Sequence, residues 1–391
     1  MKMGASESLL SSSAIPTSYR PAVQTQMEAT GTQSTAIETP LAHAHKSAGA
    51  NLGVWFGCGL PDDFGDWQRE YAIAKQSVGL IDKNYLAYFS FSGPDRARYL
   101  NAILTNNVKD LQPGQGNISL LLNPQGRILA EIETQALPDR LLCISHAMIR
   151  AQVAETLEKF IIMDDVTLTD ETDRYGTLSL QGPQTAQLIR ELAPSIDLNA
   201  LIDFSSIDTQ INSIPCTITK KSFANLPIAD IRVERKDLEP LWNFLAPKTQ
   251  SSGGGLVGYK ALNALRLEQN IPWFGYDFGD KQIPHEAGLQ DSHISYTKGC
   301  YTGQEIVERV RSRGQVNRRR VSLRFSNANH PPAAGTILTA GGKEVGTVTS
   351  ASPLPQQLDS IGMGYARKEN ATPGSELTFT TAESTGKAIV I

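Results

Sequence analysis

The chain has 391 residues, of which 40% are hydrophobic and 19% are charged. This length allows two or three domains with sizeable cores, and the composition excludes a wholly disordered protein. With 36 basic and 40 acidic residues the net charge is −4, so the molecule as a whole is not built around a polyanion. No apolar run approaches the roughly 20 residues that cross a bilayer, and we expect a soluble protein.

The first 48 residues are rich in Ser, Thr, Ala and Gln and poor in large apolar side chains. A stretch of this kind cannot bury enough surface to fold, so residues 1–48 are expected to form a disordered leader. The leader lacks the apolar core of a signal peptide, and its acids balance its bases, unlike a transit peptide. A cytoplasmic location is therefore expected, with an organelle as the lesser alternative.

Helices and strands alternate over the next part of the chain, residues 49–315. Residues 62–76 have helical spacing, 85–91 read as a strand, and Gly93-Pro94 leads into a helix over 94–104. The same order of strand, Gly-Pro and helix returns over 175–192, with Gly182 following Gly93 by 89 residues. The repeat predicts two similar α+β halves, about 79–165 and 174–315. Alternatively, Gly-Pro merely separates two unrelated strand–helix units.

The remaining segments complete a mixed α+β pattern. Strands are expected over 117–123, 127–137, 140–146 and 228–234, and helices over 149–162, 237–245 and 259–270. From about residue 316 short strands alternate with Gly, Pro and Asn turns, which predicts a separate antiparallel barrel or sandwich over 316–391. GxGxxG at 253–258 follows a polar stretch, so it does not indicate a dinucleotide site.

Cysteine and histidine give few conventional signals. The six histidines are dispersed, and His285 and His293 are expected to be surface or supporting residues. The four cysteines contain no CxxC pair, which argues against a disulfide framework or a self-sufficient zinc or iron–sulfur site. They are Cys58, Cys143, Cys216 and Cys300.

The segment from Lys298 to Glu305, KGCYTGQE, stands apart. Thr302 and Glu305 have capping-box spacing, so a helix should begin at Thr302, with Cys300 just ahead of its positive end. That end, together with Lys298, would lower the pKa of the Cys300 thiol and suit it to nucleophilic or redox work. The alternative is a small buried Cys300 in a tight turn, and the residues alone leave both open.

The octapeptide matches KGC[FY]xGQE, the signature of the YgfZ family of folate-binding proteins. These are related to the T-protein, the aminomethyltransferase of the glycine cleavage system, and the likeness extends from about residue 75 to the C-terminus. It implies a folate cavity with a C-terminal barrel, tetrahydrofolate or another reduced folate as cofactor, and no stably bound metal. It also implies a role in assembling or repairing iron–sulfur proteins, including tRNA-modifying enzymes, with Cys300 as a transient cluster ligand.

Further site residues follow from the same resemblance. Glu131 aligns with the acid that activates folate in T-proteins, after Asn123 at the start of that motif, while Ala130 replaces a neighbouring acid. Asp230 occupies the position of the acid that holds the pterin ring, and Arg266 could bind the glutamate tail of folate. The folate-binding set is completed by Gly299, Tyr301, Gly303, Gln304 and Glu305. Without the resemblance, Asp230 would be a solvent-facing strand residue and Arg266 part of a helix-surface pair.

Seven arginines follow the octapeptide and suggest an electropositive rim for a folate tail, an acidic partner or, less favoured, tRNA. A solvated helix face is the simpler interpretation. They are Arg309, Arg311, Arg313, Arg318, Arg319, Arg320 and Arg324.

These features favour a folate-binding accessory protein for iron–sulfur clusters, using Cys300, Lys298 and Glu131. The alternatives are an aminomethyltransferase that transfers a one-carbon unit to tetrahydrofolate, and an RNA-binding module.

Overall fold

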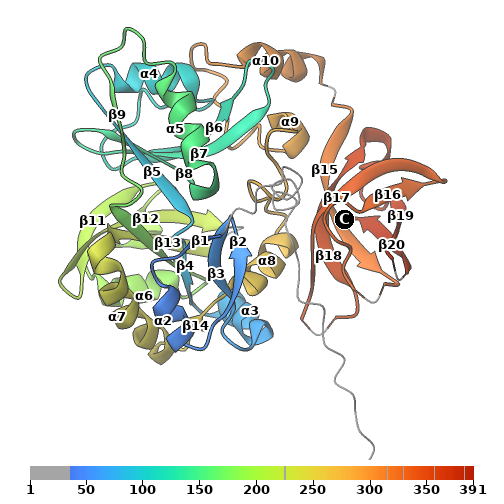
Figure 1. Ribbon diagram of the computed structural model, residues 1–391, viewed down its shortest axis with the longest axis horizontal. Coiled ribbons are helices and arrows are strands. Elements are labelled where there is room, and N and C mark those ends of the chain that lie inside the picture. The colour runs from blue at the N-terminus through green and yellow to red at the C-terminus, as the bar shows by residue number, and fades with distance from the viewer. Residues whose placement is uncertain (1–35, 224–225, 315, 329, 356, 383) are drawn as a thin grey trace, which may run out of the picture.

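The computed structural model describes residues 36–391 except 224–225, 315, 329, 356 and 383. Two antiparallel-rich sheets with helices on their outer faces form the body, and a barrel lies beside them (Figure 1). This arrangement confirms the mixed α+β prediction. No helix among the described residues is long and apolar enough to cross a membrane.

The first sheet has the order β6-β7-β8-β5-β9. Its strands are β5 (Leu86–Ser92), β6 (Gly116–Leu122), β7 (Ile128–Ala136), β8 (Leu141–His146) and β9 (Thr167–Asp170). Helices α4 (Arg96–Ile103) and α5 (Arg150–Glu158) pack on one face through an apolar cluster that includes Phe89, Ile132 and Leu157. Alternate residues of β7 therefore point into this core and away from it.

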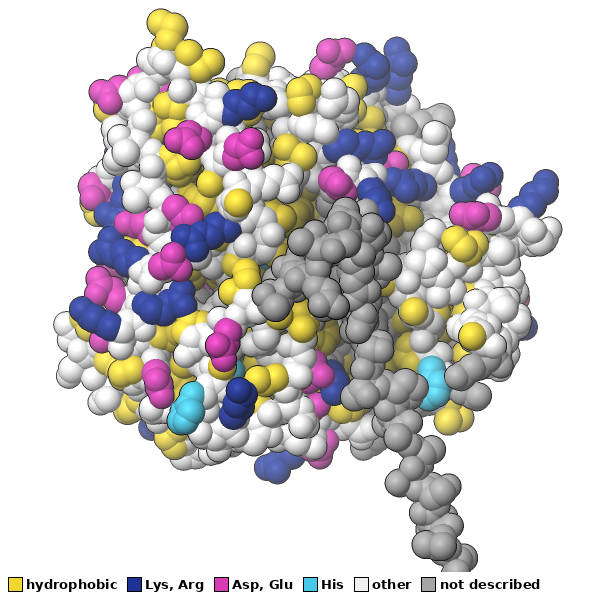
Figure 2. Space-filling model, in the orientation of Figure 1, with side chains coloured by type: hydrophobic (Ala, Val, Ile, Leu, Met, Phe, Trp, Pro, Cys, Tyr) yellow, Lys and Arg dark blue, Asp and Glu magenta, His cyan; other side chains and the backbone are white. Residues whose placement is uncertain are grey.

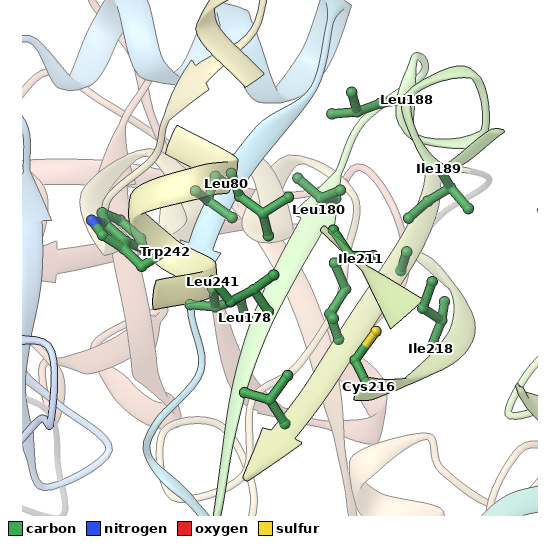
Figure 3. Packing of buried hydrophobic residues seen from close by; sticks show 14 of the residues in the cluster. Leu80, Leu178, Leu180, Leu188, Ile189, Ile211, Cys216, Ile218, Leu241 and Trp242 are labelled. Atoms are coloured by element: carbon green, nitrogen blue, oxygen red, sulfur yellow. The ribbon is translucent and has the colours of Figure 1, made fainter. Parts of the chain in front are cut away.

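The second sheet has the order β11-β12-β13-β10-β4-β14. Its strands are β4 (Gly79–Asp82), β10 (Tyr175–Gln181), β11 (Ser206–Ile211), β12 (Ile214–Phe223), β13 (Leu226–Glu234) and β14 (Gly255–Leu256). Helices α6 (Thr185–Leu192) and α7 (Leu238–Ser251) cover its outer face. Figure 3 shows Leu178 and Ile218 of the strands packing with Ile189 of α6 and Trp242 of α7 in the cluster beneath these helices.

The strand–Gly-Pro–helix repeat is confirmed. Gly93 joins β5 to α4 and Gly182 joins β10 to α6, with φ of 97° and 134°. A Cβ at Gly93 would lie 2.2 Å from the Asp165 carbonyl oxygen, and one at Gly182 would lie 2.3 Å from that of Ser77. Both turns therefore need glycine for the same two reasons, a positive φ and a close backbone.

Between the two sheets lies a layer of polar side chains, which we call the polar layer. Hydrogen bonds and ion pairs cross it, for example from Gln135 Nε2 to Thr219 Oγ1 (3.0 Å) and from Lys221 to Glu133. Because side chains alternate along a strand, the residues opposite the apolar cores all point here. The layer comprises Glu133 and Gln135 of β7, Thr177 and Ser179 of β10, Thr219 and Lys221 of β12, and Asp230 and Arg232 of β13.

The described chain begins within the expected leader, and the prediction is wrong for residues 37–48. Strand β1 (Ile37–Glu38) pairs with β3 (Cys58–Asp63), which also pairs with β2 (Asn51–Trp55). Helix α2 (Ala42–Ser47) places His45, fully buried, with Nε2 2.7 Å from Asp82 Oδ2. Thr39 Oγ1 donates to the same oxygen at 2.6 Å. The segment is held both by these donors to the buried Asp82 carboxylate and by Leu41 and Ala44, which pack in the core of the second sheet. Residues 1–35 of the leader lie outside the described residues.

The C-terminal strands close into a barrel of order β15-β18-β17-β16-β19-β20, in which β15 pairs with both β18 and β20. Its core includes Leu323, Phe325 and Phe379. The barrel alternative is therefore confirmed over a sandwich. The strands are β15 (Arg318–Ser326), β16 (Ile337–Ala340), β17 (Lys343–Pro353), β18 (Ser360–Arg367), β19 (Glu376–Thr380) and β20 (Thr385–Val390).

Four further helices belong to the body or lead from it to the barrel. They are α3 (Trp67–Gln76), α8 (Tyr259–Glu268), α9 (Pro284–Ala287) and α10 (Gln304–Arg313). Helix α8 packs against β17 and β18, and α9 packs against β15. Short 3-10 turns occur at Ala147–Ile149, Leu198–Ala200, Arg235–Asp237 and Lys368–Asn370.

Candidate functional site

The carboxylate of Glu131 lies on the same face of β7 as the polar layer. His293 Nε2 is 3.0 Å from Glu131 Oε1, and the His293 side chain is buried. Burial by itself would raise the pKa of Glu131, but the hydrogen bond with His293 and favourable electrostatic interactions outweigh it, and the net pKa is lowered. The site therefore holds a carboxylate that stays ionised, and His293 is a supporting residue.

Aromatic rings form a stack beside Glu131. The Phe56 and Tyr85 centroids are 4.2 Å apart with a 15° angle between the rings, and His146 stacks 5.6 Å from Tyr85 and 5.1 Å from Phe274. Burial lowers the pKa of His146 to about 4, so its imidazole is neutral, and its buried Nδ1 has no hydrogen-bond partner. Sequence reasoning missed Phe56, Tyr85 and His146, since each stands alone in an ordinary strand or turn.

Asp230 lies in the polar layer with its hydrogen-bonding capacity used. Oδ1 accepts from Ser179 Oγ at 2.6 Å and from Lys83 Nζ at 2.9 Å, and Oδ2 lies 2.8 Å from Lys221 Nζ. Despite burial, which would raise it, the pKa of Asp230 is lowered, chiefly by the charges of Lys221 and Lys83. Asp230 is therefore not a solvent-facing strand residue, which corrects that interpretation, and its contact with a pterin ring stays a prediction.

Lys298 does not act on Cys300 as the octapeptide suggested. Its ammonium group donates to the carbonyl oxygens of Asn101, Leu104 and Asn106 at the end of helix α4. Burial lowers the pKa of Lys298 to about 8. Lys298 therefore caps a helix, and activation of the thiol by this residue is not supported.

Cys300 itself is exposed, whereas Cys58, Cys143 and Cys216 are buried. The alternative of a buried Cys300 in a tight turn is therefore wrong. Helix α10 begins at Gln304, with Gly303 as N-cap at φ 83° and no side-chain cap, so the capping-box prediction is also wrong. The left-handed φ at the N-cap suits glycine, and the N-cap is Gly303 where the capping box predicts Thr302.

The rest of the octapeptide packs against the turn that contains Asn123. Asn123 Oδ1 accepts from the backbone N–H groups of Gln125 and Arg127 and so shapes that turn. A Cβ at Gly303 would lie 2.7 Å from the Asn123 carbonyl oxygen, whereas one at Gly299 would meet nothing within 4 Å. The structure thus brings Asn123 and the octapeptide together, but through backbone packing.

The other predicted residues of this segment have varied surroundings. Tyr301 is buried in an apolar cluster and its hydroxyl has no partner. Gln304 is half-buried, and Glu305 is exposed and pairs with Arg309 at 2.6 Å. Glu305 therefore serves an i,i+4 pair on the surface of α10 and faces away from the body.

Arg266 is fully buried and pairs with Asp277, and its Nε donates to Asn263 Oδ1 at 3.0 Å. Thr349 of β17 donates to Asp277 Oδ1 at 2.7 Å. Neither expectation for Arg266 holds, because its guanidinium lies at the junction of α8 and the barrel and reaches neither a cavity nor the helix surface.

The arginine run divides into two groups. Arg309, Arg311, Arg318 and Arg320 are held by carboxylates or carbonyl groups of this chain. Arg313, Arg319 and Arg324 form no ion pair among those of the described residues. Figure 2 shows basic side chains gathered over α10 and β15, at the upper right.

Hollows among the described residues include two that bear on the site. A small cavity is lined by polar-layer residues. Its volume of about 10 Å³ is enough for one water molecule at most. A depression of about 490 Å³ lies between α3 and Pro355, beside Tyr71 and Glu268. None of the predicted site residues except Asp230 lines either one.

The fold and site define a class: a two-sheet α+β body with an ionised carboxylate between its sheets, and a six-stranded antiparallel barrel at its side. The GCVT N-terminal domain model matches residues 41–293, and the glycine cleavage T-protein C-terminal barrel domain model matches residues 318–391. This chain belongs to the glycine cleavage T-protein family.

Relatives agree with this assignment. An aminomethyltransferase of Streptomyces avermitilis is 24% identical over 339 residues, covering 86% of this chain and 91% of the relative. A probable aminomethyltransferase of Natronomonas pharaonis is 27% identical over 361 residues, covering 90% and 96%. The crystal structure of the glycine cleavage aminomethyltransferase T from Bartonella henselae has a TM-score of 0.81 at 23% identity, covering 91% and 96%, and it shows the fold.

The family uses tetrahydrofolate, as the resemblance implied. Two features around Glu131 fit such a group: an ionised acceptor and a buried imidazole nitrogen without a hydrogen-bond partner. The oxygens of Asp230 pair with Lys83 and Lys221. Among the described residues no group of three or more His, Cys, Asp or Glu side chains could hold a metal ion.

Proposed function

We propose that the chain binds tetrahydrofolate beside Glu131 and transfers a one-carbon unit to it, as an aminomethyltransferase-type enzyme. The carrying observation is the Glu131 carboxylate, kept ionised by His293 in a largely buried place. The curated relatives support this reaction by their name. The resemblance favoured it only as an alternative, because Ala130 replaces an acid and the glutamate is one methylene longer than aspartate.

The chain's residues divide the work as follows. Tetrahydrofolate supplies the amine that accepts the one-carbon unit. An ionised Glu131 can take a proton from that amine or stabilise positive charge that develops on it, and a buried position strengthens either effect. His293 fixes the orientation of the carboxylate. The stacked rings of Phe56 and Tyr85 exclude water from the surroundings of the carboxylate.

The test is turnover of an aminomethylated lipoyl carrier with tetrahydrofolate, followed as methylenetetrahydrofolate. E131Q should lower turnover about 10²–10³-fold with little change in folate affinity, since it removes charge and keeps shape. D139N, at an exposed carboxylate, is the matched control. Equal turnover of E131Q and wild type would overturn the proposal.

A second candidate is the YgfZ-type accessory role in iron–sulfur cluster assembly or repair, with tRNA-modifying enzymes among its clients. The observation that favours it is the exposure of Cys300 within KGCYTGQE. Cys300 cannot complete a four-thiolate shell, so a partner would supply the other ligands. Here C300A should abolish rescue of an iron–sulfur enzyme defect while folate affinity stays intact. Rescue by C300A, together with robust carrier turnover, would remove this candidate.

A further inference from the structure

Gln135 of strand β7 crosses the polar layer between the two sheets, and the residue is only 2% exposed. Its Nε2 group donates to Thr219 Oγ1 of β12 at 3.0 Å and to Glu133 Oε1 on its own strand at 2.9 Å. Its Oε1 accepts from Arg232 of β13 at 3.5 Å. One amide side chain therefore ties the first sheet to two strands of the second sheet.

The small cavity beside Asp230 is bounded by these contacts. Gln135, Thr219 and Asp230 all line it, and Thr219 is the cross-strand neighbour of Asp230 in the pairing of β12 with β13. Its volume is about 10 Å³, whereas a site for a small organic molecule usually has roughly 300–1,000 Å³. In this conformation, this part of the polar layer is closed to any ring.

Gln135 also lies on the course of a ligand that is held at Glu131. Glu131, Glu133 and Gln135 are alternate residues of β7 and share one face of it, so roughly 13 Å of strand separates Glu131 from Gln135. A flat ligand that binds at Glu131 and extends along the layer to Asp230 therefore needs the space that Gln135 and Thr219 fill.

The contacts across this part of the layer differ in how readily they can separate. Lys221 of β12 pairs with Glu133, and parting them would leave a buried carboxylate without this cation. Gln135 and Thr219 are both uncharged, and separating a neutral hydrogen bond costs several times less than separating a buried ion pair. The bonds of Gln135 to the second sheet are made by its side chain, which can change rotamer. The layer is therefore easiest to open at Gln135.

We propose that Gln135 is an access gate for the folate ring. In the closed conformation its amide bonds to Thr219 and Arg232 and covers Asp230. In the open conformation the side chain swings away, and the ring enters between β7 and β13. This inference rests on the proposed function, since it concerns how tetrahydrofolate reaches the site beside Glu131. Gln135 acts on binding and not on the transfer step, because the free energy of opening weakens the apparent affinity for folate.

Isothermal titration with tetrahydrofolate tests the gate. T219V keeps a branched side chain but removes the acceptor of the Gln135 amide, and Q135A removes the amide itself. Both should bind tetrahydrofolate about 3–10-fold more tightly than wild type, as expected for the loss of one neutral hydrogen bond that holds the gate closed. Their Tm without folate should fall. A residue with a purely structural role would lower Tm without tightening binding.

S206A is the matched control. Ser206 Oγ lies 3.2 Å from Thr219 Oγ1, but both residues belong to the second sheet, so S206A should leave the affinity unchanged. T219V decides if Q135A folds poorly. Unchanged or weaker binding by T219V, or equal tightening by S206A, would overturn the gate and leave the proposed function intact. If neither wild type nor the two gate variants bind tetrahydrofolate, the proposed function is overturned and this inference with it.

Discussion

Lys298 Nζ lies 3.0 Å from the carbonyl oxygen of Asn106, and all three of its hydrogen bonds close the C-terminal end of helix α4. The octapeptide lysine thus joins two distant segments. K298M should lower the free energy of unfolding by about 1–3 kcal/mol, because the carbonyl groups lose their donor. Urea unfolding measures the change. The alkylation rate of Cys300 should stay the same, and a slower rate would revive thiol activation by Lys298.

The lowered pKa of Lys298, about 8, also predicts a pH dependence. Between pH 8 and the ordinary value of 10.5 the unfolded chain binds more protons than the folded chain at this group. The free energy of unfolding should therefore rise with pH between about 8 and 10.5, and this group should contribute no pH dependence below or above that window. The rise should be smaller in K298M; identical profiles would show that Lys298 titrates normally.

Exposure of one cysteine out of four gives a labelling prediction. Iodoacetamide should modify the native chain once, at Cys300, and four times after unfolding, because the other three thiols are buried. Mass spectrometry of intact and digested protein counts and locates the labels. C300S should take up no label in the native state. Rapid native labelling of Cys58 or Cys143 would contradict their burial.

Two glycines of the octapeptide should respond oppositely to alanine. G303A should cost about 1–3 kcal/mol, since a Cβ there meets the Asn123 carbonyl oxygen at 2.7 Å and the residue has φ 83°. G299A should change stability by less than about 0.5 kcal/mol, because nothing lies within 4 Å of its Cβ. Thermal unfolding compares them, and equal losses would rule out this packing.

Glu131 should make the chain sensitive to acid. Its folded pKa is lowered, so its stabilisation is present above the ordinary value of 4.5 and is lost as pH falls through the folded pKa. The stability difference between wild type and E131Q should therefore narrow below about pH 4. H293A should raise the Glu131 pKa, as seen by carboxylate NMR, and H293Q, which keeps a donor, should restore part of the lowering. An unchanged Glu131 pKa in H293A would show that His293 does not lower it.

The buried pair of Arg266 and Asp277 should govern how firmly the barrel is attached. R266M leaves the Asp277 carboxylate buried without its cation and should cost about 3–5 kcal/mol. T349V removes only one hydrogen bond to the same carboxylate and should cost about 1 kcal/mol. Urea unfolding with a probe in each part reports both changes. A larger effect for T349V would contradict this order.

Local signals in the sequence were sufficient for the repeat and the barrel. Gly93 and Gly182 mark turns that any chain of this shape needs, and short strands between turns specify closure well. The site was harder, because its members come from distant strands. The Glu131–His293 contact spans 162 positions, and Lys83 and Lys221 meet only at Asp230. One usable signal was the polar alternation Glu131, Glu133, Gln135, which places three polar groups on one face of β7.

The predictions for Lys298 and for residues 37–48 were wrong for the same reason. Lys298 donates hydrogen bonds to carbonyl groups at the end of α4, and His45 contacts the carboxylate of Asp82. These partners are far away in the sequence, so the contacts can be recognised only in the folded structure. Composition alone treats 37–48 as too polar to fold, whereas its polar side chains are what the body requires.

The meeting of two sheets through charged and hydrogen-bonded side chains constrains how this molecule can vary. An apolar interface between two sheets tolerates single substitutions, provided that the side-chain volume is kept. An interface of paired charges tolerates only simultaneous substitutions of both partners, because replacing one partner leaves the other as an unpaired buried charge. In homologues that are about 24% identical, we therefore expect the residues of the polar layer to be substituted together. The residues of the two apolar cores should be substituted one at a time.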